Sequence, residues 1–349
     1  MLVALRSRRH IAPFALHRPD TLAEALALRS APGPSAFLAG GLDLIDWLKQ
    51  GNAVDRLIRL DGLPDLATVS DRPDGLRIGA MVRHAGITDS ALIRGAVPDL
   101  AELWNGIANP RVRFSGTIGG NVMAGRPEYD ALPALMALGA EAEVALAPSG
   151  GAEVTPIHTI VAGEGGPSTH PSKSAPTQPV MAGDRAREGA EGPPSTALSE
   201  PAPQAADANA SPVLTDAGRQ RIPLDHLAAL TQPLVTAFVI PVRAPATLRL
   251  FADRSLRPVI TVWCGLTLAD QLVATLRLAV GMAYPSAVCA TMPLDLPLAS
   301  LGANAADIAA GITRLLPEPV SDGQASAAYR RRMTGVLTRR ILVRIGSSA

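Results

Sequence analysis

The fold is decided by one stretch of the chain, NPRVRFSGTIGGNVMAGRPEYDALPALMALGAEAEVAL, residues 109–146. Its centre is a glycine-rich turn at 115–125, and glycine lets a backbone adopt positive φ and approach a ligand closely. Apolar residues at helical spacing predict a helix over 133–140. Alternating apolar residues then predict a strand over 141–147. A glycine turn therefore stands directly ahead of a helix and a strand.

The segment N-terminal to this stretch contains another glycine turn. An apolar run at 36–41 ends in two glycines, and helical spacing predicts a helix at 42–51. A helix at 21–31, with Thr21 as its cap, precedes the run, and a strand at 56–60 follows the second helix. The order helix, strand, glycine turn, helix, strand is that of an α/β unit.

Further strands and helices are predicted along the rest of the chain. The predicted strands are 76–82, 234–242 and the antiparallel hairpin of 259–268 and 272–283, and the predicted helices are 84–109, broken near Pro98, 303–316 and 326–345. The C-terminal part is therefore predicted to be a small sheet with helices.

Residues 148–212 differ in kind from the rest. They are rich in Pro, Gly, Ser and Ala and contain no Phe, Tyr or Trp. Such a segment buries too little apolar area to offset its loss of conformational entropy. We predict a disordered insertion there, and we expect its deletion to leave cofactor content unchanged.

Length and composition restrict the class of protein. The 349 residues exceed one ordinary core, which predicts two or three lobes. The net charge of +1 does not favour nucleic acid as a partner. No apolar run reaches the length of a membrane span, so a soluble, cytoplasmic protein is the expectation. The two cysteines, Cys264 and Cys289, are too few for an iron–sulfur cluster and lack the spacing of a zinc site, so free thiols are expected.

The two glycine turns carry the chemistry. We call AGGLDL (39–44) the first glycine loop and TIGGN (117–121) the second glycine loop. Successive backbone amides in such loops form a concave anion site, and two loops that face each other could hold the two phosphates of a dinucleotide. One Gly-Gly pair alone is more often a tight turn. Neither loop fits the Rossmann or P-loop pattern.

The motifs together resemble a known family. LAGGLDLIDWLKQG (38–51) resembles its first FAD loop, LRIGAMVRHAGI (76–87) its IGA strand, 109–146 its second FAD loop, and 321–342 its closing helix. The family is that of the FAD-binding medium subunits of molybdenum hydroxylases of the xanthine dehydrogenase and carbon monoxide dehydrogenase type. The resemblance covers nearly the whole chain outside 148–212.

The resemblance implies an α+β fold: a two-lobed vanillyl-alcohol-oxidase (PCMH)-type FAD-binding domain and a C-terminal domain of a small antiparallel sheet and helices. The implied boundaries are 1–60 for the first lobe, 61–240 for the second lobe with the insertion, and 241–349 for the C-terminal domain. It also implies two partners, a small subunit with [2Fe–2S] clusters and a large molybdopterin subunit, in a heterotrimer or its dimer. FAD would pass electrons from the clusters to an external acceptor, with no catalytic acid or base from this chain.

The family's FAD contacts carry over to specific residues. The first glycine loop supplies Ala39, Gly40, Gly41, Leu42, Asp43 and Leu44, the second supplies Thr117, Ile118, Gly119, Gly120 and Asn121, and Asp130 follows. Backbone amides are expected to do most of the binding, with the Thr117 hydroxyl and the Asn121 amide added. For Asp130, a helix cap before LPALMALGA (132–140) is the alternative. Arg113 is expected to brace the second loop, and Tyr129 to lie at the surface or a subunit interface.

Departures from the family keep other functions open. Leu42 stands where the family usually has a polar side chain, so a scaffold subunit that has lost FAD is one alternative. A free-standing flavin oxidoreductase is another, although no substrate-binding cap motif is present. The family often carries a Lys or Tyr close to the flavin near the start of the C-terminal domain, and Leu250 stands about where the Lys would be.

Overall fold

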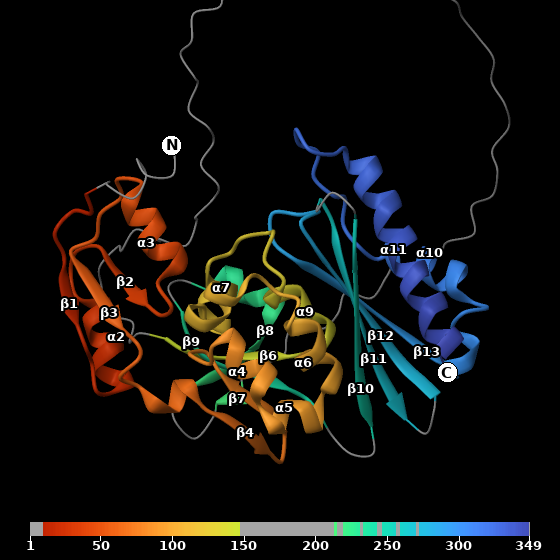
Figure 1. Cartoon of the computed structure of the whole chain (residues 1–349), viewed down its shortest axis with the longest axis horizontal. Helices are drawn as coiled ribbons and strands as arrows, with labels where there is room; N and C mark the ends of the chain where they lie inside the picture. Colours follow the sequence, from red (N-terminus) through yellow and green to blue (C-terminus); the bar gives the residue numbers. More distant parts are fainter. Residues whose placement is uncertain are drawn as a thin grey trace, which may run out of the picture. The chain divides into compact units, whose positions relative to one another are not determined.

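Three β-sheets organise the described part of the chain (Figure 1). The computed structural model describes residues 10–146, 213–214, 219–230, 233–242, 246–255, 259–269 and 272–348. The predicted insertion at 148–212 lies outside the described residues. Each sheet falls within one of the three parts expected from the sequence, whose status as separate domains stays a prediction.

The first sheet is parallel and has the strand order β1-β3-β2. Its elements are β1 (Ala15–His17), α2 (Leu22–Ser30), β2 (Ser35–Leu38), α3 (Leu42–Lys49) and β3 (Arg56–Arg59). Thr21 caps α2, because its side chain accepts a hydrogen bond from the Glu24 amide at 3.1 Å. The predicted α/β unit is therefore confirmed, and the first glycine loop lies between β2 and α3.

The second sheet has six strands in the order β4-β5-β9-β6-β8-β7. Its strands are β4 (Val69–Arg72), β5 (Gly75–Gly79), β6 (Glu141–Ala145), β7 (Val213–Leu214), β8 (Gln220–Pro223) and β9 (Leu234–Ile240). Every residue of β9 is buried, as expected for a strand with neighbours on both sides. The chain thus returns after the insertion to complete the sheet that it left at β6.

Short helices cover this second sheet. They are α4 (His84–Asp89), α5 (Ala91–Ala96), α6 (Pro98–Trp104), α7 (Pro110–Ser115), α8 (Ile118–Met123) and α9 (Ala131–Ala137). The predicted break near Pro98 is confirmed, since Pro98 begins α6. One expectation was wrong, because the second glycine loop is not simply a turn. Its residues from Ile118 onward belong to the helix α8, and Thr117 is the N-cap residue of that helix.

The third sheet is antiparallel, with the order β10-β11-β12-β13. Its elements are β10 (Thr247–Arg254), β11 (Thr261–Ala269), β12 (Leu272–Gly281), β13 (Val288–Pro297), α10 (Ala305–Arg314) and α11 (Ala327–Ser348). α10 and α11 pack on this sheet (Figure 1), while α9 packs against β11, β12 and β13. The predicted hairpin is confirmed as β11 and β12.

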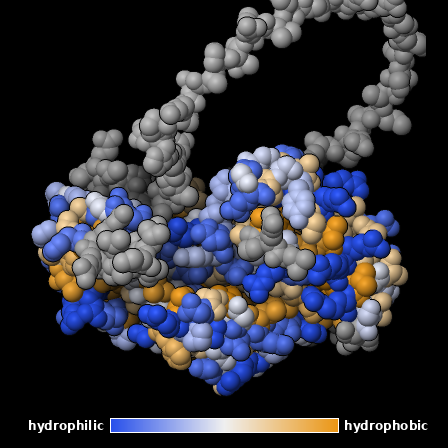
Figure 2. All heavy atoms as spheres, turned by 45° about the horizontal axis from the view of Figure 1, so that its top comes forward, coloured by the Kyte–Doolittle hydropathy of each residue, from blue (hydrophilic) through white to orange (hydrophobic). Residues whose placement is uncertain are grey.

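The surface and the cysteines add little that is unusual. On the face that Figure 2 shows, apolar residues lie in small patches among hydrophilic ones. Cys264 and Cys289 are both free, as expected. None of the helices in the described ranges has the length and apolar character that crossing a bilayer requires.

Candidate functional site

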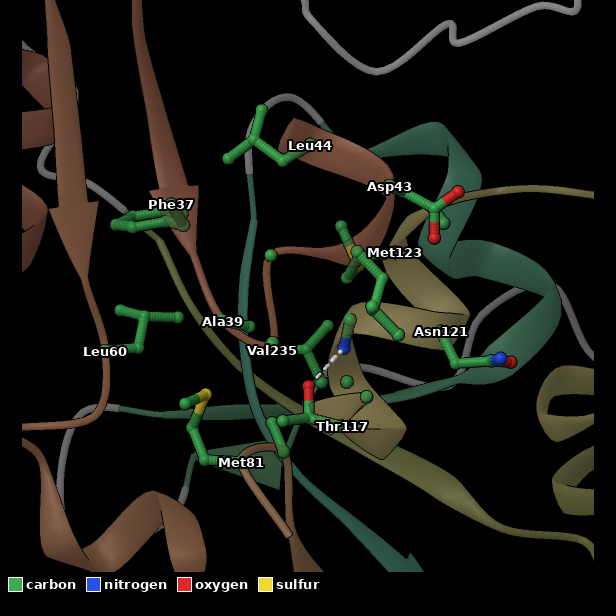
Figure 3. Close-up of a pocket in the computed structure, with 18 of the residues that line it drawn as sticks. Phe37, Ala39, Asp43, Leu44, Leu60, Met81, Thr117, Asn121, Met123 and Val235 are labelled. Atoms are coloured by element: carbon green, nitrogen blue, oxygen red, sulfur yellow. Dashed lines mark hydrogen bonds between the residues drawn. The ribbon is translucent and has the colours of Figure 1, made fainter. Parts of the chain in front are cut away.

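A cavity of about 450 Å³ lies against both glycine loops (Figure 3). This volume is typical of sites for small molecules and cofactors. One region of its wall is apolar, and its lining includes Phe37, Leu60, Met81 and Val235. Every residue that the sequence proposed as a cofactor contact lines the cavity except Ile118, whose side chain is buried in the core.

Glycine brings the first loop against the segment that precedes the second loop. A Cβ atom on Gly40 would lie 2.3 Å from the backbone oxygen of Ser115. Gly41 has a φ of +77° and is the residue from which α3 begins, and a residue with a side chain rarely adopts this conformation. Both glycines are therefore needed for the backbone path of the loop.

The first turn of α3 offers unused hydrogen-bond donors. Gly41 has no side chain to cap the helix, and the first α3 amide to bond back is that of Ile45, to the Gly41 oxygen at 3.0 Å. Helix N-termini leave their first amides without intrahelical acceptors. Among the described residues nothing accepts from the amides of Leu42, Asp43 and Leu44. The helix dipole also favours an anion here.

The second glycine loop is satisfied internally. The Thr117 hydroxyl accepts from the Gly120 amide at 3.1 Å (Figure 3), and the Thr117 carbonyl accepts from the Asn121 amide at 2.9 Å. We expected the backbone amides of both loops to serve a ligand. In the second loop the amides of Gly120 and Asn121 already have protein acceptors.

The same loop also donates hydrogen bonds to the segment that directly follows β5. The amide of Ile118 donates to Val82 at 3.0 Å and that of Gly119 to Ala80 at 2.8 Å. A Cβ on Gly119 would lie 2.6 Å from the Ala80 Cβ, so glycine is required for close packing at this position. The second loop is a rigid wall of the cavity.

Asn121 is the polar group that this loop leaves open. Its Oδ1 atom is buried and has no hydrogen-bond partner among the described residues, and the residue lines the cavity. A buried acceptor without a partner costs about 1–3 kcal/mol. A ligand hydroxyl in the cavity would remove that cost.

The family model and the curated relatives agree with this geometry. Residues 12–169 match the FAD binding domain in molybdopterin dehydrogenase. This part of the chain is similar to that family. The carbon monoxide dehydrogenase medium chain of Afipia carboxidovorans is 37% identical over 134 residues, which are 38% of this chain and 46% of that protein. The xanthine dehydrogenase FAD-binding subunit of Escherichia coli O157:H7 is 29% identical over 130 residues, 37% of this chain and 44% of that one. The matches thus span less than half of each relative's length.

Solved structures confirm the predicted fold. Carbon monoxide dehydrogenase from Hydrogenophaga pseudoflava matches with a TM-score of 0.65 over 97% of this chain and 99% of that chain, at 18% identity. Quinoline 2-oxidoreductase from Pseudomonas putida 86 matches with a TM-score of 0.66 over the same shares, at 17% identity. The FAD-binding domain is therefore of the predicted PCMH type.

The residues of the cavity fit the FAD that this family binds. The open amides of α3 suit a pyrophosphate. The unpaired Asn121 oxygen suits a sugar or ribityl hydroxyl. The apolar region around Phe37 and Met81 suits a flat ring. Each class of group in the cofactor thus has a counterpart in the wall.

Asp43 and Tyr129 have roles that the sequence did not indicate. The Asp43 carboxylate accepts from Arg126 Nε at 2.6 Å and from the Tyr129 hydroxyl at 2.9 Å. Tyr129 is partly buried and lines the cavity, and its place at the surface or a subunit interface stays a prediction. The sequence carries no local signal for this contact, because the partners are 83 and 86 residues apart.

Asp130 lies at the start of α9 and lines the cavity, but its side chain makes no capping hydrogen bond. Asp130 therefore occupies the N-cap position of α9, as the alternative expected, although it does not cap the helix through its side chain. Burial raises the pKa of Asp130, and the charge of Arg254 opposes this shift. Contact between Asp130 and FAD stays a prediction.

His84 supports the second glycine loop through a contact with the residue that precedes it. Its backbone amide donates to the Gly116 oxygen at 3.1 Å. Its Nδ1 accepts from the Trp104 indole at 3.1 Å, which leaves the ring proton on Nε2. Burial lowers the pKa of His84 to about 4, so the ring is neutral at pH 7.

Two arginines hold the walls of the site. Arg113 was expected to brace the second glycine loop, but its Nη1 donates instead to the carbonyls of Ile107 and Ala108, at 3.2 and 3.0 Å, in the loop before α7. Arg29, which the sequence reading missed, lines the cavity and is 3% exposed. Its Nη1 donates to Ser35 at 2.9 Å, and burial lowers its pKa. Nothing in the local sequence distinguishes Arg29 from a surface residue of α2.

Proposed function

We propose that this chain is the FAD-binding electron-transfer subunit of a molybdenum-containing hydroxylase or dehydrogenase. In that role FAD would accept electrons from the [2Fe–2S] clusters of a partner and deliver them to an external acceptor. The observation that carries the proposal is the cavity between two glycine loops, with open amides on α3 and the similarity of residues 12–169 to that family.

The residues that would hold FAD divide by chemistry. The amides of Leu42, Asp43 and Leu44 would bind the pyrophosphate. Thr117 and Asn121 would contribute side-chain hydrogen bonds, the former by donating its hydroxyl proton while its oxygen caps α8. The glycines and Ala39 would form the wall against which the cofactor lies, and Asp130 would contact the ribityl and phosphate region.

The bound FAD supplies the redox chemistry, and the chain supplies position and electrostatics. Apolar side chains line one region of the cavity. The His84 ring is neutral at pH 7 and is held by Trp104. We assign no general acid or base to this chain, and its residues act by binding and orienting.

The partners and the substrate belong to the proposal as well. Relatives of this chain are medium chains and subunits by name, such as the medium chain of carbon monoxide dehydrogenase. We propose a small [2Fe–2S] subunit and a large molybdopterin subunit as partners, in a heterotrimer or its dimer, in the cytoplasm. The substrate would bind to the large subunit and is not encoded in this chain.

Leu42 does not argue for a scaffold that has lost FAD. Its side chain is 42% exposed, and its contribution to the site is a backbone amide that a leucine retains. The free-standing oxidoreductase has no specific observation in its favour. The subunit role therefore has the better support.

The test is the absorption spectrum of the full chain purified alone and with its co-expressed neighbours. We expect bound FAD near one per chain, and iron, molybdenum and two further chains in the co-purified complex. A colourless protein in both preparations would refute FAD binding. FAD without the metals or partner chains would instead indicate the free-standing enzyme.

A further inference from the structure

Asp43 places a negative charge in the helical turn whose amides are open. It lies in the first turn of α3, so its own amide is one of the donors there. A carboxylate close to a pyrophosphate repels it, and the repulsion is strongest where protein walls displace water. The first glycine loop therefore combines a donor set with a repelling group.

Two side chains from the segment after α8 offset that charge. Arg126 donates from Nε to Asp43 Oδ1 at 2.6 Å, and the Tyr129 hydroxyl lies 2.9 Å from Oδ1 and 3.0 Å from Oδ2. We call this contact the Asp43 clasp. The Arg126 and Asp43 side chains are only 23% and 21% exposed, so solvent screens the pair less than it would a pair at the open surface.

The protonation of the clasp is fixed by its surroundings. Burial, and then the hydrogen bond to Asp43, raise the pKa of Tyr129 above its usual range. Its hydroxyl therefore keeps its proton and donates to the carboxylate. Both carboxylate oxygens are occupied by donors from the protein.

The clasp also connects two walls of the cavity. Asp43 and Tyr129 line the cavity, whereas Arg126 does not. The contact joins α3 to the turn between α8 and α9, and so holds the first glycine loop against the segment that follows the second. Arg126 therefore does not line the ligand space itself, and its hydrogen bond to the cavity wall is the one to Asp43.

We propose that Arg126 and Tyr129 are positioning residues for an anionic dinucleotide, which neutralise Asp43 and fix the open first turn of α3 beside the second glycine loop. This inference rests on the proposed function of the cavity as an FAD site. It deepens that function by stating why the loop tolerates an acidic residue among its phosphate donors.

A double-mutant cycle on the full chain tests the charge argument. Arg126→Met leaves the Asp43 carboxylate without its cation, and we expect the FAD Kd from flavin fluorescence titration of the apo chain to rise about tenfold. Asp43→Asn removes the charge, so the double variant Asp43→Asn/Arg126→Met should bind within about threefold of Asp43→Asn alone. Added KCl should reduce the loss of FAD affinity caused by Arg126→Met, because salt screens the charge of Asp43. Equal losses in Arg126→Met and the double variant, without salt dependence, would overturn the proposal, because a packing role predicts that pattern.

Matched variants separate the charge from folding. Arg249 makes a similar Nε to carboxylate contact with Asp99 at 2.7 Å outside the cavity, so Arg249→Met should leave the FAD Kd unchanged. If Arg126→Met does not fold, Arg126→Lys and Tyr129→Phe carry the test. We expect the lysine to retain most binding and the phenylalanine to lose less than tenfold. Wild-type binding with no effect in either variant would overturn this inference alone, whereas a wild-type chain without FAD affinity would overturn the proposed function.

Discussion

The two glycine loops look alike in sequence and differ in their hydrogen bonding. The first loop begins an uncapped helix whose first amides have no acceptor among the described residues. The second loop begins a helix that Thr117 caps, and its amides bond to the protein itself. Glycine serves the first loop through positive φ and a close approach to Ser115. In the second loop it allows close packing on Ala80. A Gly-Gly pair thus indicates a tight backbone path. Whether the loop's amides are free to donate hydrogen bonds to a ligand depends on whether a side chain caps the helix that begins there.

The largest expected effect comes from filling the space between the loops. Gly40→Ala puts a methyl group 2.3 Å from the Ser115 oxygen, so the loops must move apart. We expect the free energy of unfolding to fall by roughly 3 kcal/mol and most FAD binding to be lost. Thermal unfolding and FAD titration measure the two effects.

The control for this change is Gly95→Ala, because a Cβ on Gly95 would meet nothing within 4 Å. Gly95 lies in α5, where alanine favours the helix by up to about 1 kcal/mol. Unaltered FAD binding by Gly40→Ala would show that the loops are not in the close contact described here.

The next effect is on the support of the second loop and depends on pH. The folded pKa of His84, about 4, lies below its ordinary value of 6.5, so the unfolded chain takes up the proton first. The stability from neutral His84 is fully present above pH 6.5 and is lost as the pH falls towards 4, by roughly 2–3 kcal/mol. Urea unfolding between pH 7 and 4 measures it, and His84→Gln should flatten the slope. An unchanged slope in His84→Gln would refute the assignment.

Smaller effects are expected at Asn121, with opposite signs for stability and for FAD affinity. Asn121→Leu removes a buried oxygen that has no partner, so the FAD-free chain should gain about 1 kcal/mol of stability. The same change removes a ligand contact, and FAD affinity should fall about tenfold. Calorimetry with and without FAD separates the two. A loss of stability in the FAD-free protein would indicate that the oxygen already has a partner.

The smallest effect is expected from uncapping the second loop. Thr117→Val removes the acceptor of the Gly120 amide and should cost about 1 kcal/mol in unfolding free energy. Thr21→Val is the matched control, because Thr21 caps α2 through the Glu24 amide away from the cavity. Both variants should be destabilised, and only Thr117→Val should bind FAD more weakly. Equal FAD binding in both would restrict Thr117 to a structural role.

Sequence motifs predicted the positions of the loops and the order of the main elements. Local signals carried these predictions: Thr21 ahead of α2, Pro98 at the start of α6, and glycines between β2 and α3. The helix α8 was missed because its glycines have low helix propensity. Bonds to Ala80 and Val82, which lie far earlier in the chain, stabilise it instead.

The chemistry of single side chains in the site could not be predicted in the same way. Asp43 was expected to belong to the ligand loop, but its carboxylate pairs with Arg126 and Tyr129. Arg29 lines the cavity although it looks like a helix surface residue. Such pairings depend on where distant segments meet, and one sequence contains no local pattern for them. The strands β10 and β13 were missed for a similar reason, since the sheet pairing itself makes them strands.

The pairing of β6 with β8 has a consequence for how this protein can grow and be engineered. β6 precedes the insertion and β8 follows it after the short strand β7, and the two strands are direct neighbours, with Glu141 opposite Pro223 and Val144 opposite Gln220. The sheet therefore holds the chain on both sides of the insertion, and each doubling of the insertion's length costs only about 0.6 kcal/mol in loop-closure entropy. No residue of β6 or β8 lines the cavity. A fluorescent reporter or an affinity module inserted between them would be held by strands that contribute no residue to the flavin pocket, and natural descendants could lengthen or trim the chain there without rebuilding the cofactor site.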